Sequence, residues 1–281
     1  MSKMHTGNVP RGWLLPVVGT ALKPLGLIGL RCITLWRRLA GSIGLGVAVL
    51  WQACRPITWC RTVQEEFMRN CAQIILQGLP SIIATGLLIG LAMVNQALYW
   101  LQFAGQEGFI GEFLILALVR EIAPVLVGMI VIGRSGSMMM VELSAMRGGG
   151  QVHLLDAQGI DPFLYLVIPR VLATALGVFC LSIVFLVVAL AAGLAAANTL
   201  ALTSLTFVDL LEEVLTAIGP REYALVPLKT LAIGFAIGLI SCTTGFAVGR
   251  AVTEVPALLP QGFIKAILAT FLISGGLTLL L

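Results

Sequence analysis

The chain has 281 residues, of which 59% are hydrophobic and 11% are charged, and its formal net charge is +4. Because soluble domains carry about 25% charged residues, this composition excludes an ordinary soluble protein and predicts an all-α, polytopic membrane protein. So small a positive charge is not the signature of a nucleic-acid-binding protein, and we expect no nucleic-acid partner.

Basic residues gather in the N-terminal quarter, where nine of the 17 Lys and Arg precede residue 70. The positive-inside bias places that end in the cytoplasm. The same region mixes Arg and Trp with apolar residues, which predicts amphipathic helices lying in the membrane interface. The apolar stretch from Leu39 to Gln52 is too short to cross. We therefore predict two regions, an N-terminal cytoplasmic and interfacial one over 1–69 and a transmembrane one over 70–281.

Long uncharged stretches fill the second region, and a spanning helix needs roughly 20 mostly apolar residues. They predict five spans, at about 79–101, 110–133 (continuing as a helix to 146), 165–197, 224–248 and 263–281. An acidic outer loop is expected over 198–222, and a loop with Pro256 and Pro260 before the last span. Five spans from a cytoplasmic start put the C-terminus on the periplasmic side.

Small residues recur four positions apart on these spans, a spacing that lets helix backbones approach closely. The pairs are Gly86 and Gly90, Gly193 and Ala197, Gly234 and Gly238, and Gly245 and Gly249. Two interpretations remain open, packing within one chain and a dimer face.

Two charges interrupt the second span. Arg120 and Glu121 are adjacent, and Pro124 cannot donate the hydrogen bond that the carbonyl of Arg120 would accept in a helix. Charges at membrane depth are costly and usually mark a pathway or a binding site. Lys229, in the fourth span, is the candidate partner of Glu121. The alternative is an ion network that only holds the bundle together.

The sequence Gly133-Arg134-Ser135-Gly136 matches the serine motif of rhomboid-type intramembrane proteases. A serine nucleophile needs a base within hydrogen-bond reach, and the two histidines, His5 and His153, are on no predicted span. Close packing of the glycines and the serine against another helix is the competing interpretation. Two histidines far apart also predict no metal site.

A polar segment follows the second span, from Arg147 through three glycines to Gly159-Ile160-Asp161-Pro162. It is cytoplasmic by parity and predicts a short surface helix between two turns, with Asp161-Pro162 capping the next span. An apolar stripe at 152, 154 and 155 favours docking over a plain loop. Since no Walker A sequence is present, any ATPase must be a separate chain.

In order along the chain, these motifs resemble the MlaE (YrbE) family of ABC-transporter permeases over about residues 30–281. The matching positions are Arg120-Glu121-x-x-Pro124, Gly133-Arg134-x-Gly136, Glu142-Leu143, Met146-Arg147, Gln151, Gly159-Ile160-Asp161-Pro162, Tyr165, Pro169-Arg170, Lys229-Thr230 and Cys242 to Gly245. The resemblance implies a homodimeric, multi-pass permease of a Gram-negative inner membrane that moves phospholipids between the inner and outer membranes. It is a transport component and not an enzyme.

The resemblance also implies partners and site residues. ATP and Mg would be held by a cytoplasmic ATPase of the MlaF type, and lipid would be exchanged with a periplasmic MCE-domain protein of the MlaD type; the chain itself needs no cofactor. Arg120, Glu121 and Lys229 would meet the lipid headgroup. Acyl tails would meet apolar residues of the first span, namely Leu87, Leu91 and Val94. The ATPase would contact a coupling segment over about 146–158, through Arg147, Gln151, Val152, Leu154, Leu155 and Asp156.

The coupling segment departs from the family pattern. Gly149-Gly150 stand where the family has Thr or Ser and Glu before the glutamine, and His153 replaces an acidic residue. With a carboxylate missing, the two glycines are expected to weaken the coupling helix by roughly 1 kcal/mol each relative to alanine, and the ATPase surface should differ to match. Thr253 to Gly262 also lacks the family's glycine- and arginine-rich stretch.

Two other functions fit the same sequence. One is an ABC permease for another apolar cargo, such as a sterol, a hopanoid or an organic solvent. The other is a membrane scaffold that transports nothing.

Overall fold

The computed structural model describes residues 41, 44–53, 55, 60–103, 115–199, 212, 216, 220–247 and 255–280. The chain divides into Met1–Val47 and Ala48–Leu281, and nearly all described residues belong to the second unit. The main elements of that unit, in the part that is described, are all helices. The all-α prediction is therefore confirmed.

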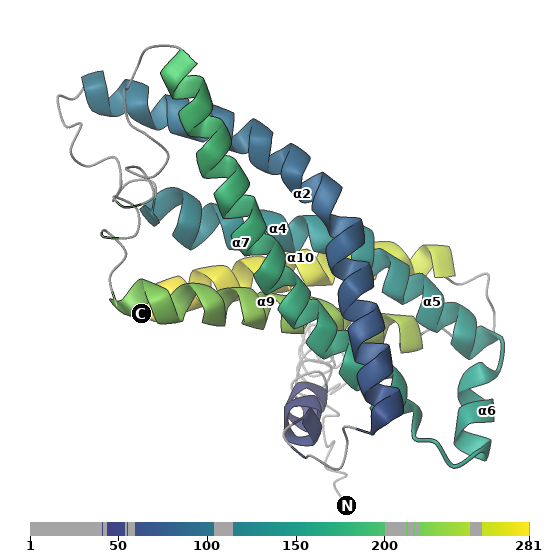
Figure 1. The fold of residues 1–281 in the computed structure, drawn as a ribbon. Coiled ribbons are helices and arrows are strands. Elements are labelled where there is room, and N and C mark those ends of the chain that lie inside the picture. Colours follow the sequence, from purple (N-terminus) through teal and green to yellow (C-terminus); the bar gives the residue numbers. More distant parts are fainter. Residues whose placement is uncertain are drawn as a thin grey trace, which may run out of the picture. The chain divides into compact units, whose positions relative to one another are not determined.

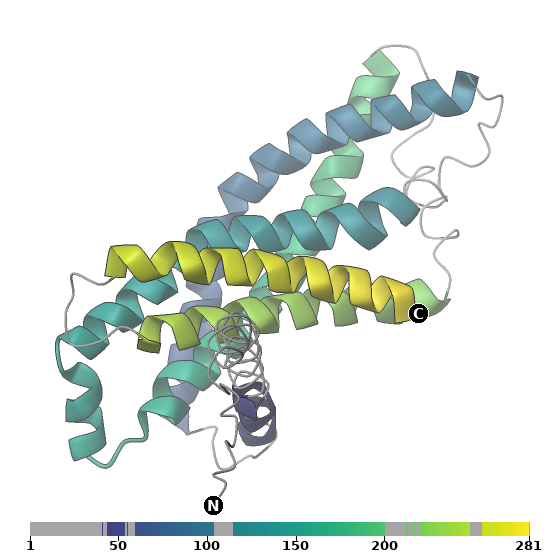
Figure 2. The same cartoon turned by 180° about the vertical axis from the view of Figure 1, so that it is seen from behind.

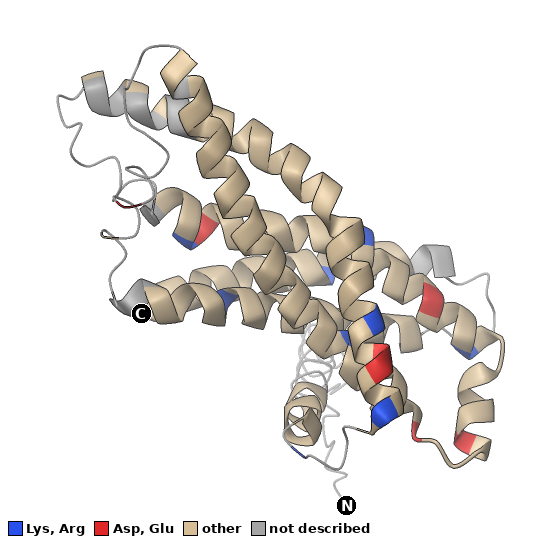
Figure 3. Ribbon diagram, viewed as in Figure 1, with Lys and Arg blue, Asp and Glu red and all other residues tan. Residues whose placement is uncertain are grey.

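Four helices of the described part are long and apolar enough to cross a membrane: Arg61–Met93, Phe163–Ala196, Tyr223–Ala247 and Leu259–Leu280. They lie in α2 (Arg61–Phe103), in η5 (Phe163–Val167) with α7 (Ile168–Thr199), in α9 (Pro220–Ala247) and in α10 (Val255–Leu280). They correspond to the first, third, fourth and fifth predicted spans, which confirms a polytopic protein. Figure 3 shows how sparse charged residues are along their middle parts.

The second predicted span is assembled from shorter helical pieces. They are η3 (Ile115–Ile122), α4 (Ala123–Val131), η4 (Ile132–Gly136) and α5 (Ser137–Gly148), and they follow one another without a gap. Two of the four, η3 and η4, are π-helical. Such wider turns inside α-helices are frequent at functional sites, and η3 carries Arg120 and Glu121.

Helices α2 and α7 run side by side in the same direction (Figure 1). Glycines of α2 allow this contact: a Cβ added at Gly90 would overlap the backbone of Ala189, and one at Gly78 would lie 2.8 Å from Cδ1 of Leu181. Gly86 and Gly90 therefore pack within the chain, as the first of the two interpretations of the small-residue pairs predicts.

Helix α9 runs antiparallel to both α7 and α10, as the view from behind also shows (Figure 2). A Cβ added at Gly234 would lie 2.7 Å from the Cα of Ala175, and one at Gly238 would lie 2.9 Å from the Cα of Val171. This second glycine pair also packs within the chain. The main core lies between these helices and includes Phe185, Ile233 and Ile237, all fully buried.

Several boundaries differ from the predicted ones. Helix α2 begins at Arg61, well before Leu79, and α10 begins at Val255, so Pro256 and Pro260 lie in a helix and the loop predicted there is wrong. Pro256 is tolerated in the first turn, where its missing N–H has no partner to lose, and Pro260 lies inside the helix. The short apolar stretch is a helix, Gly44–Ala53. The other interfacial helices and most of the acidic outer loop fall outside the described residues.

Candidate functional site

The polar break in the second span begins where η3 gives way to α4. Pro124 stands in the first turn of α4, and it has no N–H to offer to the carbonyl of Arg120. The ammonium of Lys229, on α9, donates to that carbonyl instead, at 2.8 Å. Pro124 thus cannot bond to this carbonyl, and Lys229 donates to it from another helix.

Lys229 forms the ion pair that the sequence predicts. Its Nζ lies 3.0 Å from Oε2 of Glu121, and the Lys229 side chain is fully buried while that of Glu121 is 41% exposed. The third contact is with Oγ1 of Thr278, also at 3.0 Å. An ammonium has three N–H donors, so all the donors of Lys229 are used.

Two hydroxyl groups of α10 complete the carboxylate's surroundings. Thr278 donates to Oε1 of Glu121 at 2.6 Å, and Ser274 donates to Oε2 at 3.1 Å. Sequence reasoning missed both residues. Their spacing of four places them on one helix face, but membrane helices commonly satisfy such hydroxyls locally. Thr278 itself lies 2.9 Å from the carbonyl of Ser274, so the sequence alone gave no reason to single them out.

Arg120 has a hydrogen-bond donor that the described residues do not use. Its Nη2 lies 3.5 Å from the carbonyl of Thr278, and its buried Nε has no partner among the described residues. With Lys229 and Glu121, the three side chains carry a formal charge of +1. A guanidinium with unused donors in such a site favours a phosphate or carboxylate ligand.

Of the three charged residues, Glu121 lines an apolar groove of about 520 Å³. Glu121 and Ser274 form its polar end, and the other lining residues are Ile122, Val125, Leu126, Met129, Phe271 and Gly275. These belong to η3, α4 and α10. The groove therefore joins a polar end, formed by a carboxylate and a hydroxyl group, to an apolar wall, which suits an amphiphilic ligand.

The three residues proposed for the acyl tails are not among those that line this groove. Leu87 and Leu91 are exposed on α2, whose main neighbour is α7. Val94 also belongs to α2, and its side chain is outside the described residues. The structure therefore brings together Arg120, Glu121 and Lys229 but not the predicted tail contacts.

The predicted surface helix of the cytoplasmic segment is α6 (Gln151–Ala157). The expectation that Gly149 and Gly150 weaken it is wrong, because both precede its first residue. Gly150 has φ +75°, in the left-handed region that favours glycine, so it forms the turn between α5 and α6. Gly159, with φ +78°, forms the turn at the other end. The Asp161 carboxylate accepts a hydrogen bond from the N–H of Phe163 at 2.9 Å.

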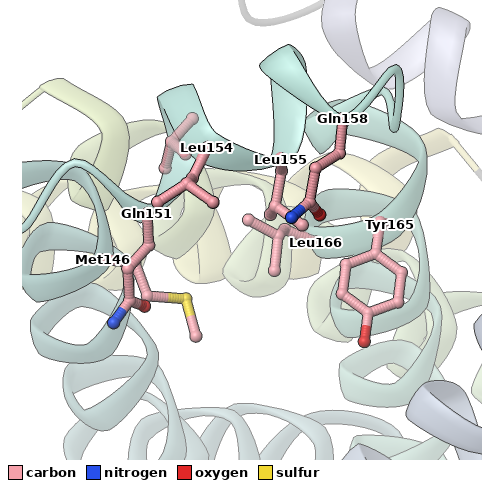
Figure 4. A pocket seen from close by; sticks show the side chains of 8 residues that line it. Met146, Gln151, Leu154, Leu155, Gln158, Tyr165 and Leu166 are labelled. Carbon is pink, nitrogen blue, oxygen red and sulfur yellow. The ribbon is translucent and has the colours of Figure 1, made fainter.

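Side chains of α6 separate into two faces. Arg147, just before the turn, and Gln151, Leu154 and Asp156 are exposed, whereas Val152 and Leu155 pack against the core. A pocket of about 300 Å³ lies between α6, the end of α5 and the start of the next helix (Figure 4); it is lined by Met146, Gln151, Val152, Leu154, Leu155, Gln158, Tyr165 and Leu166. The apolar stripe predicted at 152, 154 and 155 is thus shared between an inner and an outer face.

The serine motif does not form a nucleophile site in the described part of the chain. The hydroxyl of Ser135 is buried in η4 and has no hydrogen-bond partner there. His153 is exposed on α6, and His5 falls outside the described residues. The second interpretation holds for Gly136, since a Cβ added there would lie 3.1 Å from Oγ of Ser241.

A second ion pair joins α5 to α7. Nη2 of Arg170 lies 3.3 Å from Oε1 of Glu142, and the Arg170 side chain is 2% exposed. Both residues belong to the motifs quoted above. Helices α5 and α7 flank α6, so this pair ties together the two supports of the coupling segment.

Comparison with known proteins points the same way. The family model of the permease MlaE matches residues 67–280. A probable ABC transporter permease protein of Rickettsia typhi is 29% identical over 230 residues, which cover 77% of this chain and 86% of the relative. Protein TRIGALACTOSYLDIACYLGLYCEROL 1, chloroplastic, of Arabidopsis thaliana is 28% identical over 250 residues, or 86% of this chain and 69% of the relative.

A further relative has a more specific name. The intermembrane phospholipid transport system permease protein MlaE of Haemophilus influenzae is 30% identical over 118 residues, which cover 42% of this chain and 45% of the relative.

Proposed function

The chain belongs to the MlaE family of ABC-transporter permeases, and from this we propose that it moves phospholipids between the inner and outer membranes of a Gram-negative cell. The observation that carries the proposal is a cluster of three charges whose carboxylate lies at the polar end of an apolar groove: Glu121 lines the groove, and Arg120 and Lys229 lie behind it. A relative named as an intermembrane phospholipid transport permease supports the choice of cargo.

The groove suggests how a lipid would be held. A phosphate would accept hydrogen bonds from Arg120, whose guanidinium has donors to spare. One acyl tail would follow the groove wall formed by residues such as Val125, Met129 and Phe271. Leu87, Leu91 and Val94 of α2 stay predicted contacts for the second tail. The fixed positive charge would distinguish a phospholipid from an uncharged sterol of similar length.

The transport cycle that we propose needs other chains. A separate cytoplasmic ATPase would bind ATP and Mg, and its closure would push on the exposed face of α6, through Leu154 and Asp156 among others. Two copies of the permease would form the transport cavity, and an MCE-domain protein on the periplasmic side would exchange lipid with it. In this proposal the chain lies in the inner membrane with its N-terminus in the cytoplasm and its C-terminus in the periplasm.

The test is the identity of the bound cargo. The full-length protein is purified in a detergent free of phospholipid, its bound lipids are extracted, and they are identified by mass spectrometry. Phospholipid at one or two molecules per permease dimer is the expected result. A sterol or hopanoid in its place would assign the other cargo class. No lipid at all, together with no stimulation of a partner ATPase, would leave a scaffold as the function.

A further inference from the structure

The buried state of Lys229 is at odds with a direct role in headgroup binding. Its side chain is fully buried, and its three donors go to the carbonyl of Arg120, to Glu121 and to Thr278. No donor is left for a phosphate. If Lys229 meets a lipid, one of these partners has to withdraw first.

Thr278 is the partner that contacts all three charged residues. Its hydroxyl bonds to Lys229 at 3.0 Å and to Glu121 at 2.6 Å, and its carbonyl oxygen lies 3.5 Å from Nη2 of Arg120. These contacts come from the last turn of α10, whose neighbours Leu279 and Leu280 are more than four-fifths exposed. Thr278 therefore covers the charged site from a helix end that has little apolar packing of its own.

Helix α10 is packed unevenly along its length. In its first half, a Cβ added at Gly262 would lie 2.7 Å from Cγ2 of Thr244 and 2.8 Å from Sδ of Met140, and Ala266 is fully buried. The first half is thus fixed against α5 and α9.

The second half has room to bend. Within the described part of the chain, nothing lies within 4 Å of a Cβ added at Gly275 or Gly276. Two adjacent glycines in a helix interior give the backbone more freedom than any other pair. They separate Ser274, which is 3% exposed, from Thr278. A bend there would withdraw Thr278 while Ser274 keeps its bond to Glu121.

From this geometry we propose that Thr278 is a latch over the charged site, and that α10 bends at Gly275–Gly276 to present Lys229 and Arg120 to an anionic lipid headgroup. The proposal rests on the proposed function for the nature of the ligand. The latch itself is a property of this chain, and it can be measured without lipid.

Lysine modification measures the latch directly. The purified full-length permease is treated with formaldehyde and a borane reductant, which methylate accessible amines, and peptides are quantified by mass spectrometry. Lys265, exposed on the packed half of α10, is the internal reference. We expect the Lys229 to Lys265 ratio to rise about tenfold in Thr278→Val, which removes the hydroxyl at nearly constant size; that factor corresponds to about 1.4 kcal/mol, the size of one hydrogen bond.

Three variants make the test specific. Thr278→Ser keeps the hydroxyl and should return the ratio to the wild-type value. Thr270→Val removes a buried hydroxyl of the same helix that bonds, among the described residues, to the carbonyl of Ala266, and it should leave the ratio unchanged. Gly276→Ala stiffens the joint and should lower the ratio about fivefold, which corresponds to about 1 kcal/mol.

The outcomes separate the latch from the proposed function. A wild-type ratio in Thr278→Val, or an equal rise in Thr270→Val, would overturn the latch even if phospholipid copurifies with the protein. If Thr278→Val does not fold, an unchanged ratio in Gly276→Ala overturns it in the same way. The expected changes in a protein that carries no phospholipid would uphold the latch and count against the proposed function.

Discussion

Lys229 on α9 donates a hydrogen bond of 2.8 Å to the backbone carbonyl of Arg120, to which Pro124 has no N–H to offer. The proline in α4 and the lysine in α9 therefore act on the same carbonyl group. The charged site is stabilised by a hydrogen bond to the backbone as well as by bonds between side chains. A mutation of Lys229 therefore breaks both kinds of bond.

Removing Lys229 alone should be more harmful than removing the whole ion pair. In Lys229→Met, the carbonyl of Arg120 and the carboxylate of Glu121 both lose a donor. Breaking a buried pair costs about 3–5 kcal/mol, and because Glu121 is 41% exposed we expect about 2 kcal/mol. The double variant with Glu121→Gln should recover part of this loss. Thermal unfolding of both variants in one detergent measures the difference, and an equal or larger loss in the double variant would contradict the pairing.

Filling the groove should remove lipid without harming the fold. Gly275 lines the groove and has free space around it, so Gly275→Leu should place four carbons where an acyl tail would lie. We expect bound phospholipid to fall at least fivefold with little change in the unfolding temperature. Gly133→Leu is the matched control, since a Cβ at Gly133 would meet only ordinary contact, 3.9 Å from Cε2 of Phe263, and Gly133 is not part of the groove lining. Equal lipid loss in the two variants would mean that the groove does not hold the tail.

The contact between α2 and α7 should tolerate no added methyl group at its tightest point. A Cβ at Gly90 would overlap the backbone of Ala189, so Gly90→Ala has to push the helices apart, at about 1–3 kcal/mol. Gly276→Ala, on the open face of α10, should instead stabilise the protein, by up to about 1 kcal/mol. Thermal unfolding distinguishes the two, and a neutral Gly90→Ala would contradict the close approach.

The turn before α6 should require glycine at one position. Gly150 has φ +75°, and alanine in the left-handed region costs about 1–2 kcal/mol. Gly150→Ala should therefore displace α6 and lower stimulation of the partner ATPase, while Gly150→Asn, which tolerates this conformation, should retain most of it. ATPase assays of the reconstituted transporter provide the measurement. Equal ATPase stimulation by the two variants would show that the conformation of this turn does not affect coupling to the ATPase.

The parts of the site that could be predicted from the sequence are the charged residues within long apolar segments. Arg120, Glu121 and Lys229 are conspicuous because an isolated charge in a membrane helix needs a partner, and the ion pair predicted between α9 and the second span is present. The order of the spans followed from hydropathy for the same reason, since helix length and apolar content are local properties.

The remaining features depend on how helices meet. Ser274 and Thr278 are ordinary hydroxyl residues until α10 is packed against η3, and the groove exists only between α4 and α10. Wider π turns leave no compositional mark, so η3 and η4 looked like one continuous span. The sequence predicts that Gly149-Gly150 weaken a helix, because its first residue, Gln151, cannot be located without the backbone angle of Gly150.

Headgroup recognition by the charged site is tested most directly by bound-lipid analysis of Arg120→Gln/Glu121→Gln against Arg61→Gln/Glu65→Gln. The control pair is an exposed ion pair of 3.2 Å at the start of α2, so it changes charge equally at a different place. We expect phospholipid to be retained by the control and reduced at least tenfold in the first variant, about the effect of one charge-assisted hydrogen bond. Equal phospholipid occupancy in both, with transport intact, would contradict the account.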